Sequence, residues 1–264
     1  MARGTRLVGL LLGPWFAACS APTPGGAGAA VEQDGIVNGM TDTTHHAVFG
    51  IVANDQELCS GSLISPNLLL TARHCVASLS SGDSTVDCNS SGFGKTFAPS
   101  AFVVTSDSDI TNGVAQSALY GVTAVRVPTD TSLCGNDVAL LILDTNIPAG
   151  TATPMEPRVD EAPKVNEAYS AVGYGLNDPN DAQGVTAGIR RSLGDQAVGC
   201  VGALQCNGTN AQNDEWAAES PVCSGDSGGP ALDAQGRVIG VASRADETCA
   251  VALYSTVSSW KDLI

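Results

Sequence analysis

Ser227 is the residue of this sequence best placed to act as a nucleophile, because it lies in the glycine-rich segment GDSGGP at residues 225–230. Attack by a serine on a carbonyl requires a base within hydrogen-bond reach, a carboxylate that fixes this base, and N–H groups that face the developing oxyanion. Glycine permits positive φ angles and close approach of a substrate. The N–H groups of Gly225 and Ser227 are therefore candidates for an oxyanion hole, although the segment alone also fits a plain glycine-rich turn.

His74 is the candidate base. It lies in the segment TARHC, directly after an apolar run and beside a cysteine, so the end of a strand would hold it rigidly. The other two histidines, His45 and His46, lie near the start of the folded part, where we expect surface residues. Taken alone, a single histidine in this setting is more often structural than catalytic.

Asp137 is the candidate carboxylate, since it precedes the buried-type residues of the segment NDVALL. An acid in this position lies either at the exposed edge of a strand or in the interior. A buried carboxylate needs a hydrogen-bonded partner, and His74 would supply one. The chain thus offers a base, a carboxylate and a hydroxyl in the order histidine, aspartate, serine.

These three segments, in this order, resemble the signature segments of the trypsin and chymotrypsin-like serine proteases. The sequence IVNG from Ile36 also resembles the start of the mature chain in that family, and the similarity extends to about Trp260. The resemblance implies an all-β fold of two six-stranded antiparallel β-barrels with the active site in the cleft between them. It also implies a serine endopeptidase acting on protein or peptide substrates, in which Ser227 attacks, His74 transfers the proton and Asp137 orients the imidazole.

The resemblance further implies activation by cleavage. A new amino group on Ile36 would pair with Asp226, and this buried pair would shape the oxyanion hole, so the uncleaved chain is expected to be a nearly inactive zymogen. Asp34 and Gly35 precede the cut, where digestive relatives carry Lys or Arg. We therefore expect another type of protease, or the enzyme itself, to cut there.

Alignment with the family places Pro221 at the base of the specificity pocket and Ser243, Ala245 and Ala252 along its walls. Trypsin-like cleavage after Lys or Arg uses an aspartate at the base, and this chain has none there. Relatives often carry glycine at the positions of these two alanines. The added methyl groups narrow the specificity pocket, so we expect a preference for substrates with small apolar side chains. Arg244 replaces an aromatic residue; a cation there would favour acidic substrates, but we expect this arginine to point to water.

Nine cysteines are present, an odd number. Without Cys19 eight remain, which in an exported chain indicates four disulfides. Zinc is the competing use of cysteine, but no pair shows the arrangement that zinc sites need. The resemblance implies two bridges that are common in the family, Cys59–Cys75 and Cys223–Cys249. Position in the sequence adds Cys200–Cys206, and the remaining two cysteines give Cys88–Cys134.

The N-terminus is typical of an export signal. Arg3 and Arg6 precede a mostly apolar run, Leu7–Ala18, which is too short to span a bilayer. The segment FAAC, which ends at Cys19, resembles the lipobox of bacterial lipoproteins, so we expect a bacterial-type precursor with a lipid anchor on this cysteine. The alternative is an ordinary signal peptide whose Cys19 is removed. Either way, we expect a protein that is secreted or attached to the cell envelope.

The expected domain organisation follows from these features. The segment after the signal is rich in Ala, Pro and Gly and is typical of a linker or propeptide. Four prolines between residues 144 and 163 exclude a central strand or a helix there, so this stretch is expected to connect two halves. The expected parts are a signal peptide (1–19), a linker or propeptide (20–35) and a peptidase domain (36–264). This domain is expected to consist of an N-terminal barrel (36–147) and a C-terminal barrel (148–264).

Short β-forming runs bounded by turn residues indicate many strands, which favours a sandwich or barrels. One short helix is expected at Ser258–Ile264, and the Ser/Gly/Asp-rich segment Ser78–Gly94 is expected to be a surface loop that borders the substrate or is inert. The expected strands are Val48–Ala53, Gly61–Ile64, Leu68–Thr71, Ala101–Thr105, Val122–Val127, Val138–Leu143, Ala168–Gly173, Val238–Ser243 and Ala252–Val257.

The composition narrows the class of partner. Hydrophobic residues make up 43% of the 264 residues, which is enough for a sizeable core. A net charge of −15 is repelled by phosphate backbones, which argues against nucleic acid, and it favours solubility outside the cell. The chemistry requires no metal or organic cofactor, loop acids without EF-hand spacing do not indicate calcium, and we expect a monomer.

Two other functions are compatible with parts of the pattern. A binding or regulatory protein on the same fold would generally lack a member of the triad or a glycine near the serine, and this chain keeps all of them. A serine esterase more often shows a G-x-S-x-G segment and the order serine, acid, histidine. The order in this chain favours the protease.

Overall fold

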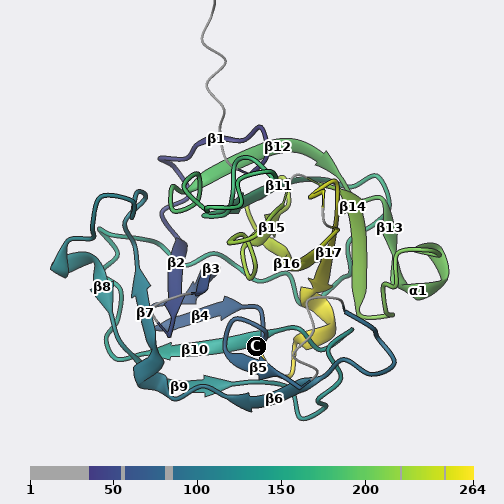
Figure 1. Ribbon diagram of the computed structural model, residues 1–264, viewed down its shortest axis with the longest axis horizontal. Helices are drawn as coiled ribbons and strands as arrows, with labels where there is room; N and C mark the ends of the chain where they lie inside the picture. Colours follow the sequence, from purple (N-terminus) through teal and green to yellow (C-terminus); the bar gives the residue numbers. More distant parts are fainter. Residues whose placement is uncertain (1–35, 55–56, 81–85, 221, 247) are drawn as a thin grey trace, which may run out of the picture. The chain divides into compact units, whose positions relative to one another are not determined.

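The structure is a computed structural model, and the residues that it describes belong to one compact unit. Nearly all regular structure in this part is β-strand, so the predicted all-β class is confirmed (Figure 1). No helix among the described residues is long and apolar enough to cross a membrane. The predicted signal peptide and propeptide, Cys19 and Pro221 lie outside the described residues, which are 36–54, 57–80, 86–220, 222–246 and 248–264.

One sheet comes from the first half of the chain and has seven antiparallel strands. They are β2 (Val48–Ala53), β3 (Glu57–Ser65), β4 (Leu68–Thr71), β7 (Phe102–Thr105), β8 (Leu119–Tyr120), β9 (Val122–Arg126) and β10 (Ala139–Leu143). Their order across the sheet is β8-β7-β2-β3-β4-β10-β9. The central strands are almost entirely buried, as their apolar sequences require.

The other sheet has eight strands, most of them from the second half of the chain. They are β1 (Met40–Thr41), β11 (Ala168–Gly173), β12 (Arg191–Ala197), β13 (Cys200–Val201), β14 (Glu215–Glu219), β15 (Pro230–Leu232), β16 (Val238–Ala245) and β17 (Val251–Thr256). Their order is β1-β12-β11-β15-β16-β17-β14-β13. Both sheets are barrel-like and hold more strands than the six that the resemblance implied, and β1 pairs with β12 although it precedes the first sheet in sequence.

All nine predicted strands are confirmed to within two residues at their ends, except that β3 begins at Glu57, four residues before the predicted start at Gly61. The two ends of the predicted loop Ser78–Gly94 are strands instead, since they pair as β5 (Ala77–Leu79) and β6 (Phe93–Thr96). Phe93 is buried there in a small core with Leu133. The C-terminal helix is a 3₁₀ turn that starts one residue early; the short helices are η1 (Pro99–Ala101), η2 (Gln116–Ala118), α1 (Gly202–Gln205) and η3 (Val257–Trp260).

One hydrophobic core is formed mainly by the seven-stranded sheet, with Val238 and Val241 of β16 added to it, and a second core lies within the eight-stranded sheet. In the eight-stranded sheet Trp216 stacks on Tyr254 with ring centroids 4.1 Å apart. Trp260 and Ile264, near the C-terminal end, pack against the core that is formed mainly by the seven-stranded sheet. The last residues, which follow β17 of the eight-stranded sheet, therefore connect the two sheets.

Candidate functional site

His74 and Asp137 meet because β4 and β10 are antiparallel neighbours, with Thr71 opposite Ala139. His74 lies just after β4 and Asp137 lies just before β10, so the register brings the two residues to the same end of the sheet. His74 Nδ1 lies 2.7 Å from Asp137 Oδ2, and the His74 backbone N–H donates to Asp137 Oδ1 at 2.9 Å. Asp137 is 1% exposed. Of the two expectations for this acid, the structure therefore has the buried one, with His74 as partner.

Two serines of the eight-stranded sheet hold Asp137 from the other side. The Ser243 hydroxyl donates to Asp137 Oδ2 at 2.6 Å, and the Ser255 hydroxyl donates to the Asp137 carbonyl oxygen at 2.8 Å. Ser243 had been assigned only to a pocket wall, and Ser255 was missed because no motif marks it. The carboxylate is thus fixed by groups from both sheets.

The charges around this pair favour an imidazolium next to a carboxylate. Burial alone would lower the pKa of His74, but the charge of Asp137 and the hydrogen bond to it outweigh burial and raise the pKa from its ordinary 6.5. Glu57 adds to this rise, whereas Arg244 opposes it. Burial alone would raise the pKa of Asp137, but His74 and the hydrogen bond from Ser243 lower it overall. His74 is therefore a stronger base than a free histidine, and Asp137 stays ionised beside it.

The loop that carries Ser227 is fastened to both sheets through its backbone. The Ser227 carbonyl oxygen accepts from the Ser60 N–H at 2.8 Å, and the Gly225 carbonyl oxygen accepts from the Ser60 hydroxyl at 2.9 Å. On the other side, the Gly228 N–H donates to the Ala242 carbonyl oxygen at 2.7 Å. No sequence signal marks Ser60 for this role, since neither its type nor its place after a cysteine is unusual.

Glycine is required at Gly225 and Gly228 for two reasons. Their φ angles are +97° and +82°, in the region that side chains disfavour. In addition, a Cβ at Gly225 would lie 2.7 Å from the Gly175 Cα, and a Cβ at Gly228 would overlap Thr71 Oγ1 and the Ser60 carbonyl oxygen. The glycines of the GDSGGP segment therefore allow the loop to pack backbone against backbone.

The proposed oxyanion donors are free. Within the described residues, neither the Gly225 N–H nor the Ser227 N–H donates a hydrogen bond. Between them lies Asp226, which is 1% exposed and accepts from the Gly175 N–H at 2.7 Å and the Cys223 N–H at 3.0 Å. Burial nevertheless raises the pKa of Asp226 to about 7. This carboxylate is therefore placed where a cationic partner would stabilise it.

Ile36, the predicted partner of Asp226, is fully buried in the core of the eight-stranded sheet together with Val222 and Tyr254. Its φ angle is +43°, which is sterically unfavourable for a β-branched residue. In this chain its nitrogen belongs to the peptide bond with Gly35, so the predicted ion pair would form only after cleavage.

A cavity of about 250 Å³ opens beside Ser227 and is lined in part by Ser243, Arg244 and Ala245. Three of the predicted pocket residues thus surround one space next to the nucleophile. Ala252 does not belong to the lining among the described residues; it is fully buried opposite Ala245 in the β16–β17 ladder. Cys223 and Cys249 also line this cavity.

The expectation that Arg244 points to water is wrong. Its guanidinium binds both oxygens of Glu215, at 2.6 and 2.8 Å, and donates to the Asn210 carbonyl oxygen at 3.1 Å. The Glu215 side chain is fully buried and needs a cation to compensate its charge, which is why the arginine turns inward. Val86, from the segment predicted as a loop, also lines two cavities together with Arg244, so this segment borders the site.

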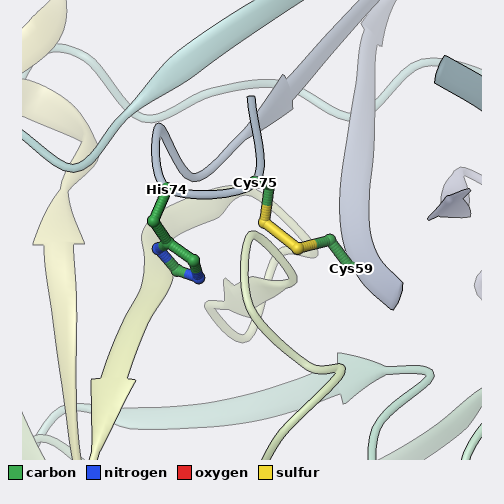
Figure 2. A group of neighbouring side chains, drawn as sticks. All are labelled: Cys59, His74 and Cys75. Carbon is green, nitrogen blue, oxygen red and sulfur yellow. A yellow bond between two sulfur atoms is a disulfide. The ribbon is translucent and has the colours of Figure 1, made fainter. Parts of the chain in front are cut away.

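The described residues contain four disulfides, and their pairing is the expected one: Cys59–Cys75, Cys88–Cys134, Cys200–Cys206 and Cys223–Cys249. Figure 2 shows His74 and Cys75 next to each other on one turn, and the bridge from Cys75 to Cys59, which lies on β3. A ring nitrogen of His74 and both sulfurs lie within 4.8 Å of one another, a spacing suited to a metal. However, sulfurs bonded to each other offer no thiolate, and Nδ1 is held by Asp137, so these groups do not form a metal site.

Comparison with known proteins agrees with this geometry. Residues 36–264 match the family described as Trypsin. A curated relative is a cercarial protease from Schistosoma mansoni, which is 26% identical over 221 residues, covering 75% of this chain and 76% of that protein. The matched family region begins at Ile36 and contains every candidate catalytic residue.

Proposed function

The chain belongs to the trypsin family of serine proteases, and on that premise we propose that it is an active serine endopeptidase that works through an acyl-enzyme. The proposal depends above all on one observation: a buried Asp137 that binds His74 Nδ1 at 2.7 Å beside the loop of Ser227. This arrangement fixes the tautomer that leaves Nε2 able to accept a proton.

In the proposed reaction, Ser227 Oγ attacks the scissile carbonyl carbon while His74 Nε2 takes the hydroxyl proton. The C=O electrons move to the oxygen, and the N–H groups of Gly225 and Ser227 bind the resulting oxyanion. Collapse of the intermediate expels the amine, which receives the proton from Nε2, and an ester to Ser227 remains. Water then repeats the sequence and releases the acid. Asp137 stabilises the imidazolium in both halves.

We propose substrates with a small apolar side chain next to the cleaved bond. The cavity beside Ser227 is only about 250 Å³, and the methyl group of Ala245 stands in its lining. A library of peptides that differ at this residue tests the preference. Cleavage restricted to bonds after Lys or Arg would contradict it.

We also propose that the protein is exported and made as a zymogen, activated by a cut before Ile36, with Cys19 as a site of lipid attachment in the precursor. The raised pKa of Asp226 supports the zymogen, because the uncleaved chain buries this carboxylate without the ammonium group that cleavage would create. If Cys19 is lipidated, the same cut would release the enzyme from the membrane. N-terminal sequencing of the soluble form tests this, and a start other than Ile36 would count against it.

An organophosphonate probe tests catalytic competence directly. The protein processed to Ile36 should be labelled covalently on Ser227, and Ser227→Ala should not be labelled. Peptide hydrolysis should fall with the label by about 10⁴-fold or more. If the processed protein takes no label, the fold would serve binding or regulation instead. If the protein is labelled and hydrolyses ester substrates but not peptides, it would be an esterase.

A further inference from the structure

Glu215, on β14, is a buried carboxylate that no motif singles out. It is fully buried and accepts four hydrogen bonds, two at each oxygen. Arg244 donates through Nη1 at 2.6 Å and Nη2 at 2.8 Å, the Gly135 N–H donates at 2.9 Å and the Gln212 N–H donates at 2.8 Å. A carboxylate with all of its acceptor sites used, two of them by a bidentate arginine, has a defined geometry.

The groups that Glu215 holds both lead to Asp137. Gly135 lies two residues before it in the loop from the seven-stranded sheet. Arg244 directly follows Ser243, whose hydroxyl donates to Asp137 Oδ2 at 2.6 Å. We propose that Glu215 is a positioning residue of the proposed protease: through Arg244 and Gly135 it fixes Asp137 on two sides, and thereby the orientation of His74.

The ion pair also has an electrostatic consequence. Arg244 lines the cavity beside Ser227 and the cavity that contains His74. The charged groups that act on His74 are Asp137 and Glu57, which raise its pKa, and Arg244, which lowers it. Glu215 offsets the charge of Arg244, so the wall between these cavities presents a neutral pair to the substrate, and selection of acidic side chains is suppressed.

Single substitutions separate the two members of the pair. Glu215→Gln keeps the shape of the side chain but leaves the charge of Arg244 without its counter-ion. Because this charge lowers the pKa of His74, the acid limb of the pH profile of kcat/KM should move to lower pH. In Arg244→Met the cation is lost, and the limb should move to higher pH. Both variants should lose about 10- to 100-fold in kcat, because small displacements of a catalytic group have effects of this size. Glu215→Gln should also gain cleavage of peptides with an acidic residue near the scissile bond.

Two further variants serve as conservative and charge-balanced tests. Arg244→Lys keeps the charge but not the bidentate fork, so the acid limb should stay near that of the wild type while kcat falls. In the double variant E215Q/R244M both charges are absent, so the limb should return towards the wild type, again with reduced kcat. Arg244→Lys keeps a cation beside the buried Glu215, and the double variant leaves no unpaired charge, so these two variants keep the test available if Glu215→Gln does not fold.

Glu167→Gln is the matched control, because Glu167 also forms a bidentate pair with a buried arginine, Arg158, but touches no residue of the site. It should lower the melting temperature without changing kcat or the pH profile. The inference is overturned if Glu215→Gln behaves like this control, or if the two single variants move the acid limb in the same direction. Failure of the wild type to react with the organophosphonate would instead refute the proposed function.

Discussion

His74 and Asp137 are held by a network of side-chain hydrogen bonds, to which Ser243 and Ser255 contribute from the opposite sheet. The loop of Ser227 is held differently, by backbone groups and by the absence of Cβ atoms at its glycines. A side-chain network can lose one hydrogen bond and keep its shape, whereas close-packed backbones accept no additional atom. We therefore expect substitutions in the first region to reduce catalysis in steps, and substitutions in the second to disrupt the loop as a whole.

The largest effect is expected from Asp137→Asn. The amide has the shape of the carboxylate, but it would present a donor where His74 Nδ1–H needs an acceptor, and it cannot stabilise an imidazolium. We expect kcat to fall by about 10⁴-fold with the fold retained. Steady-state kinetics and circular dichroism of the processed enzyme measure both. A loss of less than tenfold would show that the carboxylate is not part of the reaction.

Gly228→Ala probes the backbone-held region and should destabilise the protein by roughly 3–5 kcal/mol, since the added Cβ would overlap Thr71 and Ser60. Gly236→Ala is the matched control, because Gly236 has a similar φ of +77° but nothing within 4 Å of the added atom. It should cost only about 1 kcal/mol. Urea unfolding compares the two, and equal losses would show that backbone strain rather than close packing decides.

Asp226 should make the stability of the uncleaved chain depend on pH. Its pKa is about 7 in the folded chain against an ordinary 3.8, so between about pH 4 and 7 the folded state keeps a proton that the unfolded state has lost. This group therefore favours the folded state at low pH, and the free energy of unfolding should fall as pH rises, by up to about 1.4 kcal/mol per pH unit. Urea unfolding in a Ser227→Ala background measures this slope.

Asp226→Asn should remove that slope in the uncleaved chain. Cleavage before Ile36 should remove it as well, because an adjacent ammonium group would favour the ionised carboxylate and lower its pKa. An uncleaved chain whose pH slope is the same with Asp226 and with Asn at this position would contradict the assignment.

The smallest effect is expected from Ser60→Ala, which removes one hydroxyl from the connection between β3 and the serine loop. The Gly225 carbonyl oxygen would lose its donor and the Tyr174 N–H its acceptor, at a cost of about 1–3 kcal/mol. Ser62→Ala is the control on the same strand, because the buried Ser62 hydroxyl has no hydrogen-bond partner among the described residues. Thermal unfolding of both variants tests the difference, and a larger loss from Ser62→Ala would contradict it.

Most of the longer apolar strands could be predicted from the chain alone, whereas the polar strand β12 and several short strands could not. Leu68–Thr71 is nearly all buried and was predicted with its observed ends. In contrast β12, with the sequence RSLGDQA, lacks any apolar period and was missed, although it forms pairs with both β1 and β11. Its place in the sheet comes from its neighbours rather than from its own composition.

The sequence by itself determined which residues could react: the types at His74, Asp137 and Ser227, their order, and the glycines that the serine loop requires. The tertiary structure decided which groups meet. Arg244 could be read as a surface cation because Glu215 lies 29 residues away, and only the pairing of β14, β17 and β16 brings the two side chains together. Contacts between distant residues depend on strand register and on the desolvation of buried charge, and neither is encoded in a local pattern of residue types.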